Sequence, residues 1–141
     1  MKQSGRASWI MIVALLSVLA VTGMFLFAGE SPQTACNRFF EHLAKGNVEG
    51  LVKDGYIEGM TPEEQKKKWD YAVNVAGPYF RFIWRIKNYV KANDTHAFVN
   101  LAITTQATDY EETYRIPMVR VDGRWRVDVR GMSRGIYPAL P

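Results

Sequence analysis

The side chains that could act as a general acid or base are few and lie far apart in this sequence. A catalytic acid or base needs a tuned pKa inside a water-poor pocket. His42 borders the apolar face of a helix, where a histidine is more often hydrogen-bonded than catalytic. Asp70 follows three consecutive lysines, which indicates a surface ion pair. The other candidates are His96, Tyr89, Tyr110 and Tyr114. We therefore predict no catalytic residue.

The residue patterns of metal and phosphate sites are also missing. Two distant histidines and the single Cys36 do not form a metal-ligand cluster at any usual spacing. No GxGxxG, GxxxxGK or GxSxG string occurs in the chain. The sequence thus predicts no metal, no cofactor and no enzymatic activity, and a single cysteine excludes an intramolecular disulfide.

Arginines near the end of the chain offer a binding surface instead. Three of them alternate with large apolar residues, so in a strand they would share one basic face. Such a face is either solvated, with Asp128 as its counter-charge, or a docking surface, because arginine favours interfaces. The apolar tail over residues 132–141 docks either on its own domain or on a partner. The predicted partner-binding residues are Arg120, Arg124, Arg126, Arg130 and Tyr137.

A long apolar run near the N-terminus predicts the location of the protein. Residues 8–28 contain no charge and would span a bilayer core of roughly 30 Å as a helix. Lys2 and Arg6 precede the run and Glu30 follows it, which predicts an N-terminus in the cytoplasm. The expected organisation is a cytoplasmic head over 1–7, a single-pass transmembrane helix over 8–28, a periplasmic or otherwise extracytoplasmic domain over 29–131 and a tail over 132–141. A cleaved secretory signal is the alternative.

The periodicity of the remaining residues predicts helices followed by strands. Ser31 and Pro32 begin a helix that is interrupted at Lys45–Gly46–Asn47 and resumes to about Asp54. A second helix begins at Thr61 and ends before Gly77–Pro78. From Tyr79 onward apolar residues alternate in four strands, the last two joined by Asp122–Gly123. The predicted fold class is α+β, with helices covering one face of a curved antiparallel sheet.

Two segments of the chain resemble the nuclear transport factor 2-like superfamily. They are Phe39–Asn47, read as FFEHLAKGN, and Val121–Val127, read as VDGRWRV. Asn47 stands where an aspartate is commoner, and Arg124 separates the usual glycine and tryptophan. The resemblance covers residues 32–131 and implies a cone-like α+β fold. It also implies membership alongside isomerases, cyclases and dehydratases, in which an acid or base lies at the mouth of the cone.

These observations lead to two functional hypotheses. The first is a non-catalytic accessory or assembly subunit of a larger membrane protein complex, with the other subunits and the lipid bilayer as partners and no nucleic acid. The charge balance does not suggest a nucleic-acid partner, because residues 29–141 hold all 14 acidic residues and all but two of the 18 basic ones and are therefore nearly neutral. The alternative is a membrane-anchored protein that binds a small apolar ligand, or an isomerase- or dehydratase-like enzyme, with Asp70, Tyr79 and Trp84 lining the pocket.

Overall fold

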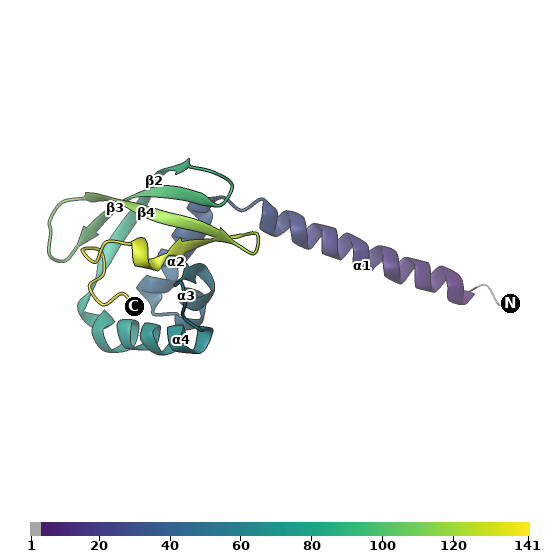
Figure 1. Cartoon of the computed structure of the whole chain (residues 1–141), viewed down its shortest axis with the longest axis horizontal. Helices are drawn as coiled ribbons and strands as arrows, with labels where there is room; N and C mark the ends of the chain where they lie inside the picture. The colour runs from purple at the N-terminus through teal and green to yellow at the C-terminus, as the bar shows by residue number, and fades with distance from the viewer. Residues whose placement is uncertain (1–3) are drawn as a thin grey trace. The chain divides into compact units, whose positions relative to one another are not determined.

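The chain consists of two separate units. The computed structural model describes residues 4–141, with the side chains of residues 4–7 and 22–28 left aside. The first unit contains one helix, α1 (Ser4–Ala28), and the second unit comprises Ser31–Pro141. The second unit carries all of the sheet (Figure 1).

The predicted membrane location is not supported by the first unit. A helix forms over the apolar run, but among the residues that the structure describes no helix is long and apolar enough to cross a membrane. The predicted transmembrane helix over 8–28 and the single-pass, periplasmic topology are therefore wrong. The predicted head over 1–7 includes residues 1–3, which lie outside the described residues.

The second unit is an α+β domain with its helices on one side of a curved sheet (Figure 1). The sheet order is β1-β5-β4-β3-β2, with β1 parallel to β5 and the other neighbours antiparallel. The sequence predicted the four long strands but not β1, which makes the sheet mixed. The helical elements are α2 (Pro32–Lys45), α3 (Val48–Asp54), α4 (Pro62–Asp70), the π-helix η1 (Tyr71–Ala76), and the 3-10 helices η2 (Gly77–Tyr79) and η3 (Val129–Gly131). The strands are β1 (Gly55–Tyr56), β2 (Phe82–Lys91), β3 (His96–Thr105), β4 (Glu112–Val121) and β5 (Arg124–Asp128).

Local capping fixes where the helices begin and end. The Ser31 hydroxyl accepts a hydrogen bond from the backbone N–H of Thr34, and Pro32 occupies the first turn of α2. Gly46 ends α2 with a φ of 69°, a left-handed conformation that glycine adopts without strain. Thr61 and Glu64 form a reciprocal capping box at the start of α4. These helix boundaries follow the sequence prediction.

The core lies between the helices and the concave face of the sheet. Phe39, Phe40 and Trp69 are fully buried, and the Phe39 ring packs edge-on against both of the other rings. Trp125 on β5 is 5% exposed, as its alternation with arginines predicted. The same face is closed at one end by the C-terminal tail, whose Ile136, Tyr137 and Leu140 are all buried.

Candidate functional site

The C-terminal tail over 132–141 packs onto its own domain, one of the two placements that the sequence left open. The Tyr137 ring packs edge-on against Phe80 and Phe82, with ring centroids 5.3 Å and 6.3 Å away. Its buried hydroxyl donates a 2.9 Å hydrogen bond to the carbonyl oxygen of Ala72. Arg134 folds the tail by donating to the carbonyls of Pro138 and Leu140. A tail without helix or strand is thus part of the folded domain.

Gly77 makes room for the Tyr137 hydroxyl. A Cβ atom at position 77 would lie 2.5 Å from the Tyr137 oxygen and 3.0 Å from the Ala72 carbonyl oxygen. Real Cβ atoms do not approach oxygen that closely, so a side chain at this position would displace the tyrosine. Gly77 follows η1, a π-helix, which is a rare conformation in proteins. The end of the α4–η1 helix and the tail therefore fit together at one point.

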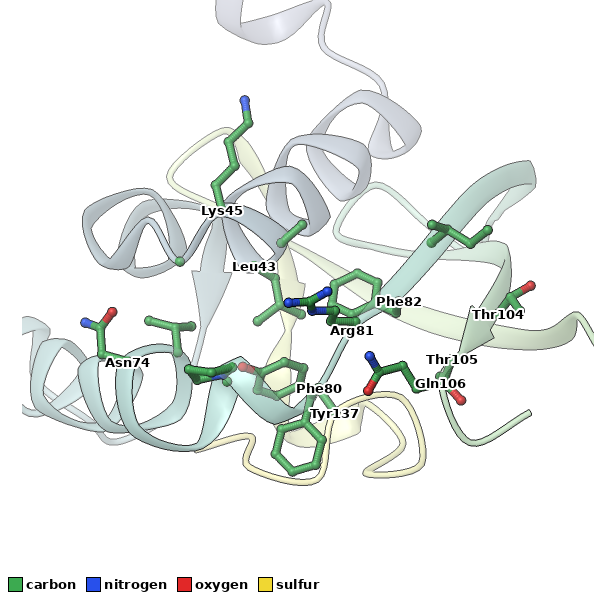
Figure 2. Close-up of a pocket in the computed structure, with 16 residues that line it drawn as sticks. Leu43, Lys45, Asn74, Phe80, Arg81, Phe82, Thr104, Thr105, Gln106 and Tyr137 are labelled. Atoms are coloured by element: carbon green, nitrogen blue, oxygen red, sulfur yellow. The ribbon is translucent and has the colours of Figure 1, made fainter. Parts of the chain in front are cut away.

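An open groove of about 710 Å³ lies beside this contact, between the end of α2, the η1–η2 segment, the start of β2 and the end of β3 (Figure 2). Its floor is apolar and includes the side chain of Tyr137 from the tail. The apolar lining residues, together called the floor here, include Leu43, Val73, Phe80, Phe82 and Tyr137, and the polar lining residues are Lys45, Asn74, Arg81, Thr104, Thr105 and Gln106. A concave apolar site with a few polar groups is the usual form of a small-molecule site, commonly about 300–1,000 Å³ in volume.

The groove lining contains no carboxylate, imidazole or thiol. Its one tyrosine, Tyr137, has a pKa raised above the ordinary value of 10.0 because the phenol is buried. That hydroxyl therefore stays protonated and continues to donate to Ala72. The titratable side chains in this lining are therefore Lys45, Arg81 and the protonated phenol of Tyr137.

The three predicted pocket residues are not brought together in this groove. The Asp70 carboxylate is exposed at the end of α4 and accepts a hydrogen bond from Asn74. Tyr79 is 77% exposed. Trp84 lies on β2, donates its indole N–H to Asn37 of α2 at 2.9 Å and packs near Phe40. None of the three is among the described residues that line the groove.

The predicted partner-binding arginines lie on two different faces. Arg120 pairs with Trp125 across the β4–β5 hairpin and so shares the face of that tryptophan, with its guanidinium carbon 6.0 Å from the indole centroid. Arg124 and Arg126 lie on the opposite face of β5. Arg130 is exposed on η3, and Tyr137 is buried in the tail contact. Docking onto a partner through these residues stays a prediction.

Arg124 belongs to a charge cluster that the sequence did not reveal. Asp54, at the end of α3, is only 1% exposed. Its carboxylate accepts hydrogen bonds from Arg124 at 2.6 Å and from two nitrogens of Arg38 at 2.9 Å and 3.1 Å. His42 Nε2 lies 3.0 Å from the same carboxylate, and its Nδ1 lies 3.2 Å from the Asn47 side-chain amide. The cluster joins α2, α3 and β5, and His42 contributes to it from α2.

Burial and hydrogen bonding also alter the pKa of two groups outside the groove. Cys36 is fully buried in α2, and burial raises the pKa of its thiol well above the ordinary value. The Tyr114 hydroxyl donates to Glu112, and that hydrogen bond is the main cause of its raised pKa. Among the described residues, no group of three or more His, Cys, Asp or Glu side chains could hold a metal ion.

Sequence reasoning also missed Arg81 and Gln106, the two polar side chains that point into the middle of the groove in Figure 2. Arg81 precedes β2 and Gln106 follows β3, and neither belongs to a motif. The one available signal was position, because the two residues lie at the open ends of strands that a hairpin brings side by side.

No family model matches the chain, and no curated protein matches it. Solved structures with similarity include a domain of unknown function with a cystatin-like fold from Nostoc punctiforme, at 13% identity and a TM-score of 0.48, covering 68% of this chain and 70% of that one. A ketosteroid isomerase-like protein from Erwinia carotovora is similar at 13% identity and a TM-score of 0.41, covering 66% and 85%. A de novo designed protein with a curved β-sheet is similar at 16% identity and a TM-score of 0.44, covering 70% and 94%. At these values none of the three assigns a family or a function to this chain.

Proposed function

We propose that residues 31–141 form a non-catalytic binding domain that takes a small molecule in the groove beside Tyr137. The observation that carries this proposal is the lining of the groove. An apolar floor is combined with a polar rim that contains no carboxylate, imidazole or thiol. Such a lining can bury an apolar ligand and orient it, but offers no group with the usual pKa of a general base near neutral pH.

The packing of the core also supports a binding site at the surface. The interior of the domain is filled by Phe39, Phe40, Trp69 and the tail residues. A ligand would therefore lie against the surface at the end of the sheet rather than deep between helices and sheet. Contact with the apolar floor would favour binding by about 25 cal/mol for each Å² of apolar surface that the ligand removes from water.

The test uses the full chain and the fluorescent probe phenylnaphthylamine, which is neutral and apolar. We expect saturable binding of one probe per chain, lost in Gln106→Trp, because an indole at this exposed rim position would cover the floor. Ala107→Trp is the matched control, since Ala107 is exposed at the next position but does not line the groove. Equal binding by both variants would remove the groove as the ligand site.

An accessory role in a larger protein complex is the second candidate. Arg126 and Arg130 favour it, because neither has a hydrogen-bond or ion-pair partner among the described residues, whereas Arg124 is paired with Asp54. Charge reversal of Arg126 and Arg130 together should release co-purifying subunits and leave the circular dichroism spectrum unchanged. Co-purification at unchanged stoichiometry would contradict this role for the two arginines.

A further inference from the structure

We propose that the ligand of the groove is an amphipathic anion, with its anionic group on the guanidinium of Arg81 and its apolar body on the floor. This inference rests on the proposed binding function and adds the chemical class of the ligand. An aromatic or aliphatic carboxylate, sulfate or sulfonate has this chemistry.

The charge of the lining favours an anion. Lys45 and Arg81 are the charged residues among those that line the groove, and both are basic. A cationic ligand would meet two like charges, whereas an anion would be attracted by both. In Figure 2 Lys45 points away from the other labelled side chains, so Arg81 is the closer contact for a ligand on the floor.

Arg81 differs from most other arginines of the domain because its guanidinium is uncommitted. No carboxylate pairs with it among the described residues, and no hydrogen bond from its side chain is present there. Arg85, four residues later on β2, donates to Glu111 at 3.2 Å. Arg115 lies over the Phe98 ring, and Arg134 binds the tail carbonyls. Arg81 therefore keeps its donors available at the edge of an apolar floor.

Gln106 places a second hydrogen-bond donor beside the guanidinium of Arg81. The backbone N–H of Gln106 donates to the carbonyl oxygen of Arg81 at 3.3 Å, which holds the two residues side by side. Figure 2 shows the guanidinium of Arg81 and the amide of Gln106 both directed over the groove. A planar guanidinium binds two oxygens of a carboxylate or sulfonate at once, and the amide NH₂ is a further donor.

The apolar residues around Arg81 favour a ligand that has both an anionic group and an apolar body. Leu43 and Phe82 line the same groove as Arg81 (Figure 2). A ligand without charge would displace water from the guanidinium and offer it no acceptor, which weakens binding. A small inorganic anion would leave the floor uncovered. The combination favours an anion that carries a ring or an alkyl chain.

The experiment compares two probes that differ by one anionic group, anilinonaphthalene sulfonate and the neutral phenylnaphthylamine. We expect the sulfonate to bind at least about tenfold more tightly to the full chain, since hydrogen bonds to charged groups are the stronger ones. Arg81→Gln should weaken sulfonate binding about tenfold or more and should not weaken phenylnaphthylamine binding. Arg85→Gln is the matched control, because it removes an exposed guanidinium from β2, the strand that follows Arg81, outside the groove, and it should change neither affinity.

Two results would overturn the inference, and they are distinguishable. Equal affinity for the two probes, unaffected by Arg81→Gln but lost in Gln106→Trp, would keep the binding function and remove the anionic class. Absence of saturable binding by either probe in a folded protein, verified by circular dichroism, would remove the binding function and the inference together.

Discussion

The contact between Gly77 and Tyr137 predicts a coupling between two substitutions that lie far apart in the sequence. Tyr137→Phe deletes the hydroxyl that donates to the Ala72 carbonyl. Loss of one buried hydrogen bond should lower the free energy of unfolding by about 1–2 kcal/mol. Gly77→Ala places a Cβ atom 2.5 Å from the same hydroxyl oxygen. Overpacking of this kind lowers stability by about 1–3 kcal/mol.

The size of the Gly77→Ala effect should depend on the side chain at position 137. Gly77 has φ −59° and ψ −38°, a helical conformation in which alanine is intrinsically better by up to about 1 kcal/mol. With Tyr137 present the clash dominates, and we expect a net loss of about 2 kcal/mol. In the Tyr137→Phe background the nearest atom is gone, and only the Ala72 oxygen at 3.0 Å remains crowded. Gly77→Ala should then change stability by less than about 1 kcal/mol in either direction.

Equilibrium urea unfolding of the full chain measures this coupling through the fluorescence of the buried Trp69 and Trp125. The double variant should be about 1–3 kcal/mol more stable than the sum of the single effects predicts, a coupling within the range of residues in contact. Near-ultraviolet circular dichroism verifies that each variant keeps its packing. Effects that add within about 0.5 kcal/mol would refute the argument that Gly77 accommodates the Tyr137 hydroxyl.

Three further outcomes test other parts of the domain. Trp125→Ala should lower the free energy of unfolding by about 3–5 kcal/mol because this side chain is 5% exposed in the core, and an unchanged urea midpoint would contradict its burial. Asp54→Asn should destabilise by about 3–5 kcal/mol because it leaves two arginines without their buried carboxylate, whereas Asp94→Asn, at a side chain 96% exposed, should change stability by less than about 0.5 kcal/mol. Burial raises the pKa of Tyr137 in the folded state. The resulting contribution to the free energy of unfolding is fully present below the unfolded-state pKa of about 10 and is lost as the pH rises through the folded-state pKa. Urea midpoints from about pH 8 to about pH 11 should therefore fall less in Tyr137→Phe than in the unsubstituted chain, and parallel curves would show that Tyr137 makes no such contribution.

The local features of the fold could be predicted from the sequence because their causes are local. The ends of α2 and α4 follow from Ser31, Gly46 and Thr61, each of which acts within one helical turn. The burial of Trp125 follows from strict alternation along β5. These signals need no knowledge of what the segment packs against.

Features that join distant parts of the chain could not be predicted in the same way. Arg120 and Arg124 both have even numbers, which suggested one shared face. The hairpin, however, pairs Val121 with Arg124 and Arg120 with Trp125, so Arg120 and Arg124 lie on opposite faces of the sheet. Strand β1 has two residues and no hydrophobic pattern of its own. The Asp54 cluster gathers residues 38, 42, 54 and 124, and the groove gathers segments from α2 to the tail. Each depends on register and packing rather than on neighbouring residues.

The apolar run over 8–28 shows a different limit of sequence reasoning. The sequence predicted a helix here, and α1 forms over Ser4–Ala28. Hydropathy alone, however, does not state where such a helix resides.

The buried carboxylate of Asp54 also predicts how sequences of this fold can diverge. A carboxylate that is 1% exposed and contacts Arg38, Arg124 and His42 cannot be lost alone without removing the buried acceptor that joins α2, α3 and β5. Positions 38, 54 and 124 should therefore be inherited as a unit, changing together to apolar residues or not at all. In an alignment of homologues, this trio should co-vary more tightly than the exposed arginines of the same domain.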